Sequence, residues 1–142
     1  MVTKAHNVYI TNVDHTLNIA LPGLTPSLQL IGSNKFGGAF HSYSLKTPAT
    51  LTTLTNDYFG SGYTHDGASL NITDSRKDSQ CNTRSDNCTV FMDFNEKEMK
   101  LWNITDTSAT TLLGTGEYND VAKSNQYVHS GWATEDKKYI LL

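Results

Sequence analysis

The sequence predicts an all-β fold, a single-domain antiparallel sandwich or barrel of Greek-key type, and three observations lead to this prediction. Apolar residues alternate with polar ones over short stretches, which is the period of a strand with one buried face. Residues that form turns interrupt these stretches about every ten positions, as in sandwiches and barrels. Threonine is abundant, and its β-branched side chain suits a half-exposed strand. Because the chain has 142 residues, we expect one domain over residues 1–142.

The first part of the chain contains five such stretches. A Pro22-Gly23 pair ends the second one, since neither residue continues a strand easily. A turn is expected over residues 12–15, between the first two stretches. We therefore expect strands at residues 8–10, 17–21, 28–31, 39–45 and 51–54.

The second part is expected to contain a strand at 68–72 and a hairpin over residues 90–104. Val90, Met92 and Phe94 alternate before a charged tip, and apolar residues alternate again after it. A helix over 96–102 is the alternative, but it would have only about two turns and would be marginal by itself. Residues 139–142 are expected to form the last core strand, with an exposed edge strand at a dimer contact as the alternative.

The longest polar segment, residues 74–87, has balanced charges and is predicted to be an exposed loop. Cys81 and Cys88 are the only cysteines of the chain. A disulfide between them would close a loop of about eight residues and stabilise the fold by about 2.5 kcal/mol. Two free thiols are the alternative, whereas the spacing does not suit a zinc or redox site.

Charge and composition exclude several classes of partner. The chain has 11 Lys and Arg against 14 Asp and Glu, so we expect no nucleic-acid partner. It has no apolar run long enough for a transmembrane helix. Asn71, Asn87 and Asn103 begin glycosylation sequons, but about two to three are expected by chance in so polar a chain. No signal peptide is expected within the chain, and its location stays open, with an extracellular one preferred.

One pattern occurs more often than the composition of the chain would produce by chance. The motif N-D-x-x-x-S, followed shortly by Y-x-H-x-G, begins at Asn56 and again at Asn119, 63 positions later. We predict an internal repeat over roughly residues 28–68 and 90–132, which would give the fold two related halves. The packing interpretation makes these segments equivalent bends, in which Tyr fills the core and Gly is left-handed. The functional interpretation makes them a pair of polar sites.

Two families are similar in short stretches. The N-D-x-x-[Gly/Lys]-Ser element resembles the calcium clamp of βγ-crystallins, and Lys35-Phe36-Gly37-Gly38 resembles their aromatic-x-Gly motif, which the second copy lacks. That resemblance implies a structural or calcium-binding domain, although Lys123 would oppose a cation in the second copy. Residues 81–86, together with the length and mild acidity, resemble aegerolysins, which are lipid-binding β-sandwiches, but the Trp-Asp-Cys-Pro-Trp segment of that family is absent.

The motifs of catalysis are missing from the sequence. It contains no H-E-x-x-H zinc motif, no G-x-S-x-G nucleophile elbow and no glycine-rich phosphate loop. We therefore expect a protein that is not an enzyme and has no cofactor, with calcium as the alternative stated above.

Aromatic side chains beside Asn, Asp and Ser suggest a lectin-like protein that binds glycans, since rings stack on the C–H face of sugars while polar groups bind hydroxyls. The alternatives are a lipid-binding or pore-forming toxin component that contacts membranes peripherally, and a structural protein that forms homo-oligomers. Of these rings, we expect Trp132 in particular to be partly exposed. The candidate ligand-binding residues are Asn56, Asp57, Tyr63, His65 and Asp66 in one half, and Asn119, Asp120, Tyr127, His129 and Trp132 in the other.

Overall fold

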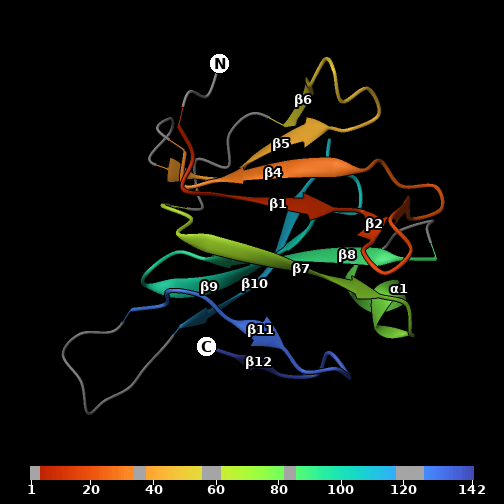
Figure 1. Cartoon of the computed structure of the whole chain (residues 1–142). Helices are drawn as coiled ribbons and strands as arrows, with labels where there is room; N and C mark the ends of the chain where they lie inside the picture. The colour runs from red at the N-terminus through yellow and green to blue at the C-terminus, as the bar shows by residue number, and fades with distance from the viewer. Residues whose placement is uncertain (1–3, 34–37, 56–61, 82–85, 118–126) are drawn as a thin grey trace, which may run out of the picture.

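The computed structural model describes residues 4–33, 38–55, 62–81, 86–117 and 127–142, and antiparallel strands dominate it (Figure 1). The all-β prediction is therefore confirmed. The elements, in chain order, are β1 (Asn7–Thr11), β2 (Val13–Asp14), β3 (Ile19–Ala20), β4 (Ser27–Ile31), β5 (His41–Ser44), β6 (Thr52–Thr55), β7 (Asp66–Ile72), α1 (Arg76–Gln80), β8 (Cys88–Phe94), β9 (Glu98–Asn103), β10 (Thr111–Glu117), β11 (Trp132–Ala133) and β12 (Ile140–Leu141).

Two four-stranded sheets form the sandwich. The first has the strand order β1-β4-β5-β6 and the second has the order β10-β9-β8-β7, while β2–β3 and β11–β12 are separate two-stranded hairpins. In Figure 1 the second sheet lies between the first sheet and the β11–β12 hairpin. The Greek-key detail of the prediction is not confirmed, because the strands of each sheet follow one another in chain order, apart from the β2–β3 hairpin inserted between β1 and β4.

Local patterns located most strands but not all of them. The hairpin expected over residues 90–104 is formed by β8 and β9. We did not predict β10, because its Thr-Leu-Leu-Gly-Thr-Gly-Glu sequence does not alternate and its pairing with β9 contains an irregularity between Leu112 and Gly114. The segment expected to be a loop contains α1, and the disulfide between Cys81 and Cys88 is present, with Cα atoms 5.9 Å apart.

The apolar core between the sheets is small and aromatic. It consists of five buried residues, Ile31, Phe40, Phe91, Trp102 and Ile104. Polar side chains share the interior: on the inner face of the first sheet Thr11, Gln29 and Ser42 are fully buried. The Gln29 amide donates a hydrogen bond to the Thr11 hydroxyl (3.2 Å) and accepts one from the Ser42 hydroxyl. These hydrogen bonds join neighbouring strands of the first sheet through their buried side chains.

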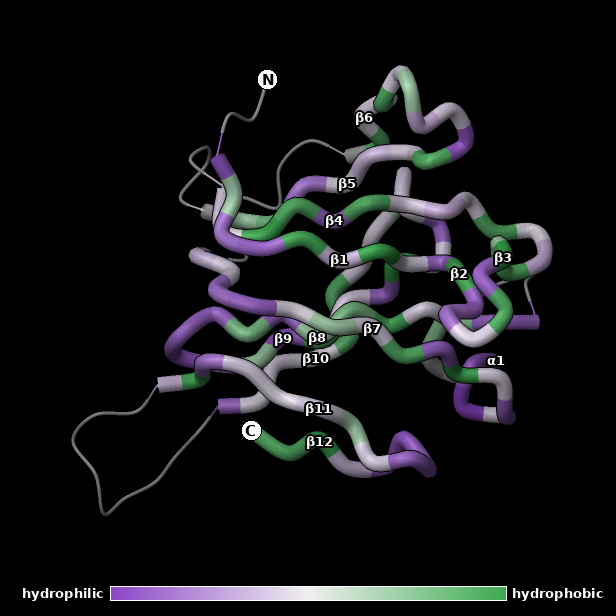
Figure 2. Tube along the Cα trace, in the orientation of Figure 1, coloured by the Kyte–Doolittle hydropathy of each residue, from purple (hydrophilic) through white to green (hydrophobic). Residues whose placement is uncertain are grey.

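The outer face of the first sheet is apolar. Figure 2 shows apolar residues alternating with polar ones along β1 and β4. Val8 pairs with Leu30 and Ile10 pairs with Leu28, so all four side chains lie on the same face, opposite Gln29. Val8 is 50% exposed and Ile10 is 42% exposed. This sheet therefore presents its apolar face outward.

The second sheet has apolar clusters on its outer face as well. Ala68, Met92 and Phe94 pack there with Val128 and with the half-buried Ile140. The expectation of a core strand at residues 139–142 holds only for Ile140, because its neighbours Tyr139, Leu141 and Leu142 are exposed. A further cluster joins the disulfide to Ile72 and Val90. The C-terminal hairpin and the α1 segment therefore cover this face.

Candidate functional site

The two copies of the Y-x-H-x-G pattern meet in space. An isolated bridge between Glu96 and Val128 attaches the second copy to the β8–β9 turn, and the His65 amide donates to the Phe94 carbonyl (2.7 Å). Tyr127 donates its hydroxyl proton to Glu96 Oε1 (2.8 Å) and lies 3.0 Å from His65 Nδ1. Because that hydroxyl has only one proton, the hydrogen atom shared with His65 must belong to Nδ1.

His65 lies at the centre of a group of rings. Its ring centroid is 4.5 Å from that of His6 and 4.4 Å from that of His129. Tyr63 and Tyr127 approach it edge-on, with centroids 6.0 and 5.6 Å away. The second ring nitrogen of His65, Nε2, is buried and makes no hydrogen bond. This His–Tyr corner, formed by His6, Tyr63, His65, Tyr127 and His129, therefore combines both copies of the pattern with an N-terminal histidine that we did not predict.

Asp66 connects the two sheets. Its Oδ1 accepts a hydrogen bond from Asn7 Nδ2 (2.8 Å) and another from the Gly67 amide (2.8 Å). Asn7 begins β1 and Asp66 begins β7, so the bond joins the facing edges of the sandwich. Asp66 thus has a structural partner that the sequence did not reveal.

The glycines of the two copies are required for space. Neither Gly67 nor Gly131 is among the residues with positive φ, so the expected left-handed conformation is wrong. A Cβ atom on Gly67 would overlap the Phe91 ring, and one on Gly131 would lie 2.6 Å from the Leu141 carbonyl oxygen and 2.9 Å from the Phe94 ring. Each copy therefore places a glycine against a phenylalanine of β8. The packing interpretation also expected Tyr to fill the core, which is wrong for the second copy, because Tyr127 is 50% exposed.

The remaining candidates fall elsewhere. Asn56, Asp57, Asn119 and Asp120 lie outside the described residues, as do the calcium clamps to which they would belong. Ligand binding at the His–Tyr corner stays a prediction.

Within the described part of the chain, no three His, Cys, Asp or Glu side chains are grouped to hold a metal ion. No helix among these residues has the length and apolar character needed to span a bilayer.

Trp132 lies apart from the His–Tyr corner, at a cavity of about 230 Å³. Its side chain is 64% exposed, which agrees with the expectation for this ring. Leu70 and Met92 provide apolar lining from β7 and β8, and polar groups complete the walls. The polar or charged lining residues are Ser69, Asn71, Thr134, Glu135 and Lys137.

Asn71 lines this cavity and has a buried acceptor without a hydrogen bond. Its Nδ2 donates to Asn87 Oδ1 (2.8 Å), whereas its own Oδ1 is buried and has no partner. The Lys137 ammonium donates to the backbone carbonyl of Asn71 (2.7 Å) and so joins the β11–β12 turn to β7. The sequence identifies Asn71 only as part of a sequon, because its position at the cavity depends on contacts distant in sequence.

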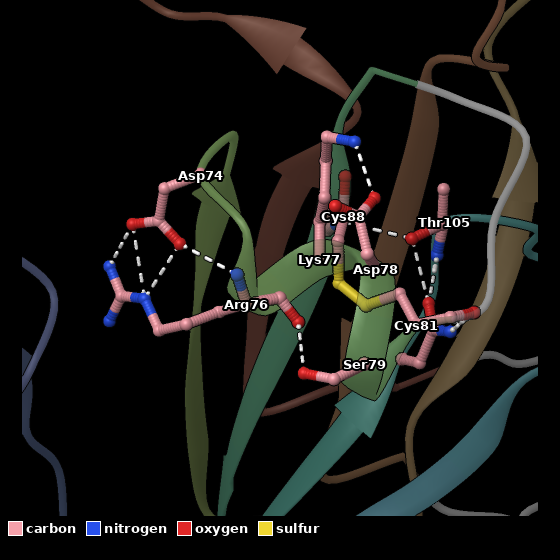
Figure 3. The surroundings of a disulfide bond; sticks show 10 residues. Asp74, Arg76, Lys77, Asp78, Ser79, Cys81, Cys88 and Thr105 are labelled. Carbon is pink, nitrogen blue, oxygen red and sulfur yellow. Dashed lines mark hydrogen bonds and ion pairs between the residues drawn. A yellow bond between two sulfur atoms is a disulfide. The ribbon is translucent and has the colours of Figure 1, made fainter.

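Arg76 also makes hydrogen bonds to the β11–β12 turn. Its guanidinium makes an ion pair with Asp74 (2.6 Å) and donates to the carbonyl oxygens of Lys137 (2.7 Å) and Asp136 (3.2 Å). Figure 3 shows the Asp74–Arg76 pair beside the disulfide of Cys81 and Cys88. The hydrogen bonds from Arg76 lower the pKa of Asp74 to about 2, so the pair stays ionised at neutral pH.

The hydrogen bonds of Lys137 and Arg76 fix the β11–β12 turn at one side of the cavity. An exposed indole ring and several hydrogen-bonding groups complete the lining. Comparison with known protein families, curated proteins and solved structures finds no match to this chain.

Proposed function

We propose that this protein is a non-enzymatic recognition protein that binds glycans at the cavity beside Trp132. The observation that carries the proposal is the 64% exposure of this large ring at the edge of a cavity that has both apolar and polar lining residues. A tryptophan normally buries most of its surface, so an exposed one beside hydrogen-bonding groups suggests a ligand surface.

The chemistry of the lining suits a sugar. The indole ring can pack on the C–H face of a pyranose, and Leu70 and Met92 supply further apolar surface. Ser69 and Glu135 also line the cavity, and their hydroxyl and carboxylate groups can hydrogen-bond sugar hydroxyls. A site this small and wet is expected to bind with a Kd in the millimolar to micromolar range.

The test compares Trp132→Ala with the wild type on a glycan array and by ligand-observed NMR. We expect the variant to lose about tenfold in affinity, since the stacking and buried area of the ring should contribute about 1.4 kcal/mol. Leu112→Ala is the matched control, because Leu112 is also exposed (49%) but lies on β10, outside the cavity lining. A blank array at high protein concentration, or unchanged binding by Trp132→Ala, would contradict the proposal.

A second candidate function, contact with a lipid surface, is favoured by the outward apolar face of the first sheet. Val8 and Ile10 are exposed there, and Leu28, Leu30 and Tyr43 are half-buried beside them. Strands β1, β4, β5 and β6 contain no Asp, Glu, Lys or Arg, so no charge would have to leave water on contact. This face is independent of the Trp132 cavity.

Flotation with vesicles of phosphatidylcholine, which has no net charge, tests the second candidate. The double variant Val8→Thr, Ile10→Thr keeps β-branched residues in β1, and we expect it to lose vesicle binding while retaining the fold. Leu112→Ala again serves as the control. Absence of flotation by the wild type would remove this candidate, and concentration-dependent self-association that the double variant abolishes would assign the face to a second copy of the chain.

A further inference from the structure

A second hollow adjoins the Trp132 cavity. It has a volume of about 480 Å³ and is lined by Thr134, Glu135, Asp136 and Tyr139. Thr134 and Glu135 also line the first cavity, so the two spaces are neighbours along the β11–β12 hairpin. Each space has one exposed aromatic ring, since Trp132 is 64% exposed and Tyr139 is 67% exposed.

From this arrangement we propose that the site takes an oligosaccharide of at least two consecutive neutral sugar residues, one stacked on Trp132 and the next on Tyr139. This inference rests on the proposed glycan-binding function and specifies its ligand class. Glu135 lies in both spaces and makes no hydrogen bond or ion pair with the described residues. Its carboxylate can therefore accept hydroxyl protons from both sugar residues.

The hairpin holds the two rings in a defined relation. The Thr134 amide donates to the Tyr139 carbonyl (2.9 Å), and the Tyr139 amide donates to the Thr134 hydroxyl (3.2 Å). That hydroxyl donates to Asp136 Oδ1 (2.7 Å), which also accepts from the Lys138 amide (3.2 Å). The turn is therefore closed by its own hydrogen bonds, and little ordering is required when a ligand binds.

The charges around the hairpin favour a neutral ligand. Lys137 donates to the Asn71 carbonyl, Lys138 lies 3.8 Å from Asp136, and Arg76 is paired with Asp74. Lys137 keeps its charge, because a backbone carbonyl is neutral, but it lines only the first cavity. The second space has no basic residue in its lining, and Glu135 has no cationic partner among the described residues. An acidic sugar in the second space would therefore lie beside the Glu135 carboxylate. A uronic or sialic acid would meet this carboxylate and bind more weakly.

The experiment measures Kd by ligand-observed NMR for neutral monosaccharides, their homologous disaccharides and the corresponding acidic sugars. We expect a disaccharide to bind at least about tenfold more tightly than its monosaccharide, by the contribution of a second stacked ring. Tyr139→Ala should lower the disaccharide affinity to that of the monosaccharide and leave monosaccharide binding unchanged, while Tyr139→Phe retains the gain. Glu135→Gln should raise the affinity for acidic sugars relative to neutral ones.

Three results would overturn the inference: equal wild-type affinities for mono- and disaccharide, loss of monosaccharide binding in Tyr139→Ala, or acidic sugars that bind the wild type as well as neutral ones. Each of these leaves glycan binding itself intact. Failure of every sugar in the panel to bind the wild type would instead refute the proposed function. Tyr139 is exposed, so thermal denaturation of both Tyr139 variants should match the wild type and exclude misfolding as the cause.

Discussion

Asp93 is the most unusual single residue of the interior. It is fully buried on β8, opposite Lys100, whose ammonium makes an ion pair with Glu98 (3.1 Å). The indole of Trp102 donates to Asp93 Oδ2 (3.1 Å), but Oδ1 has no hydrogen bond. Burial raises the pKa of Asp93 to about 6, because the charged carboxylate loses its hydration.

This pKa predicts a stability that falls as the pH rises. The folded state binds the proton more tightly than the unfolded chain, whose Asp pKa is near 3.8, so the stabilisation is complete below about pH 4 and is lost through about pH 6. At pH 7 the buried charge costs up to about 3 kcal/mol. We expect Asp93→Asn to raise the free energy of unfolding by about 1–3 kcal/mol at pH 7.5 and to change it little at pH 4, as measured by urea denaturation.

Asp106 provides a control for which we expect the opposite dependence of stability on pH. Hydrogen bonds from Ser108 lower the pKa of Asp106, so its contribution is present at neutral pH and is lost as the pH falls. Asp106→Asn should therefore reduce stability at pH 7.5. A loss of stability at pH 7.5 in Asp93→Asn would show that the buried charge is compensated.

At the scale of elements, the short helix α1 positions the C-terminal hairpin. Arg76 is its first residue, and its guanidinium reaches the two carbonyl oxygens of the β11–β12 turn. The sequence suggested only a solvated loop here, because the charges of residues 74–87 cancel and the apolar periodicity of a long helix is absent. The contacts with residues 136 and 137 lie about 60 positions away, beyond any local pattern.

Arg76→Ala should therefore loosen the hairpin more than the rest of the fold. We expect amide hydrogen exchange over residues 134–139 to accelerate severalfold, because the turn loses two hydrogen bonds. Lys77→Ala is the matched control, since Lys77 belongs to the same helix and its side chain pairs with Asp78 instead. Equal acceleration in both variants would indicate a general loss of helix stability and no specific contact.

The molecule as a whole depends on several small cores. The buried apolar residues form three clusters, between the sheets, under the C-terminal segment and around the disulfide, and half-buried residues such as Tyr9 and Leu70 connect them. Polar side chains occupy the interior near Gln29. Such a fold has little apolar area in any one cluster, so a covalent link near one of them should contribute noticeably to stability. Cys81 and Cys88 are both buried in the cluster around the disulfide.

Removing the disulfide in Cys81→Ala, Cys88→Ala should lower the free energy of unfolding by about 2.5 kcal/mol, the loop-closure term for eight residues. For a chain of this size the expected decrease in Tm is roughly 5–10 °C. Calorimetry with and without reductant provides the control, because reductant should destabilise the wild type and leave the double variant unchanged. Equal Tm values for both proteins would show that the link does not constrain the unfolded chain.

The sequence by itself determined the all-β class, the positions of most strands, the β8–β9 hairpin and the exposure of Trp132. These features follow from alternation and turn residues, which act within a few positions. The sequence also identified Tyr127 and His65 as candidate ligand-binding residues, but it did not predict the contact between them.

Only the tertiary structure decided which face of each strand is buried and which residues form the cavity. Alternation defines two faces without saying which is inside, and here Gln29 is buried while Val8 is exposed. The disulfide was one of two alternatives until the fold brought the cysteines together. The Trp132 cavity joins β7 to residues 132–137, more than 60 positions later, so pairing and packing created it, and no local pattern predicts contacts at that separation.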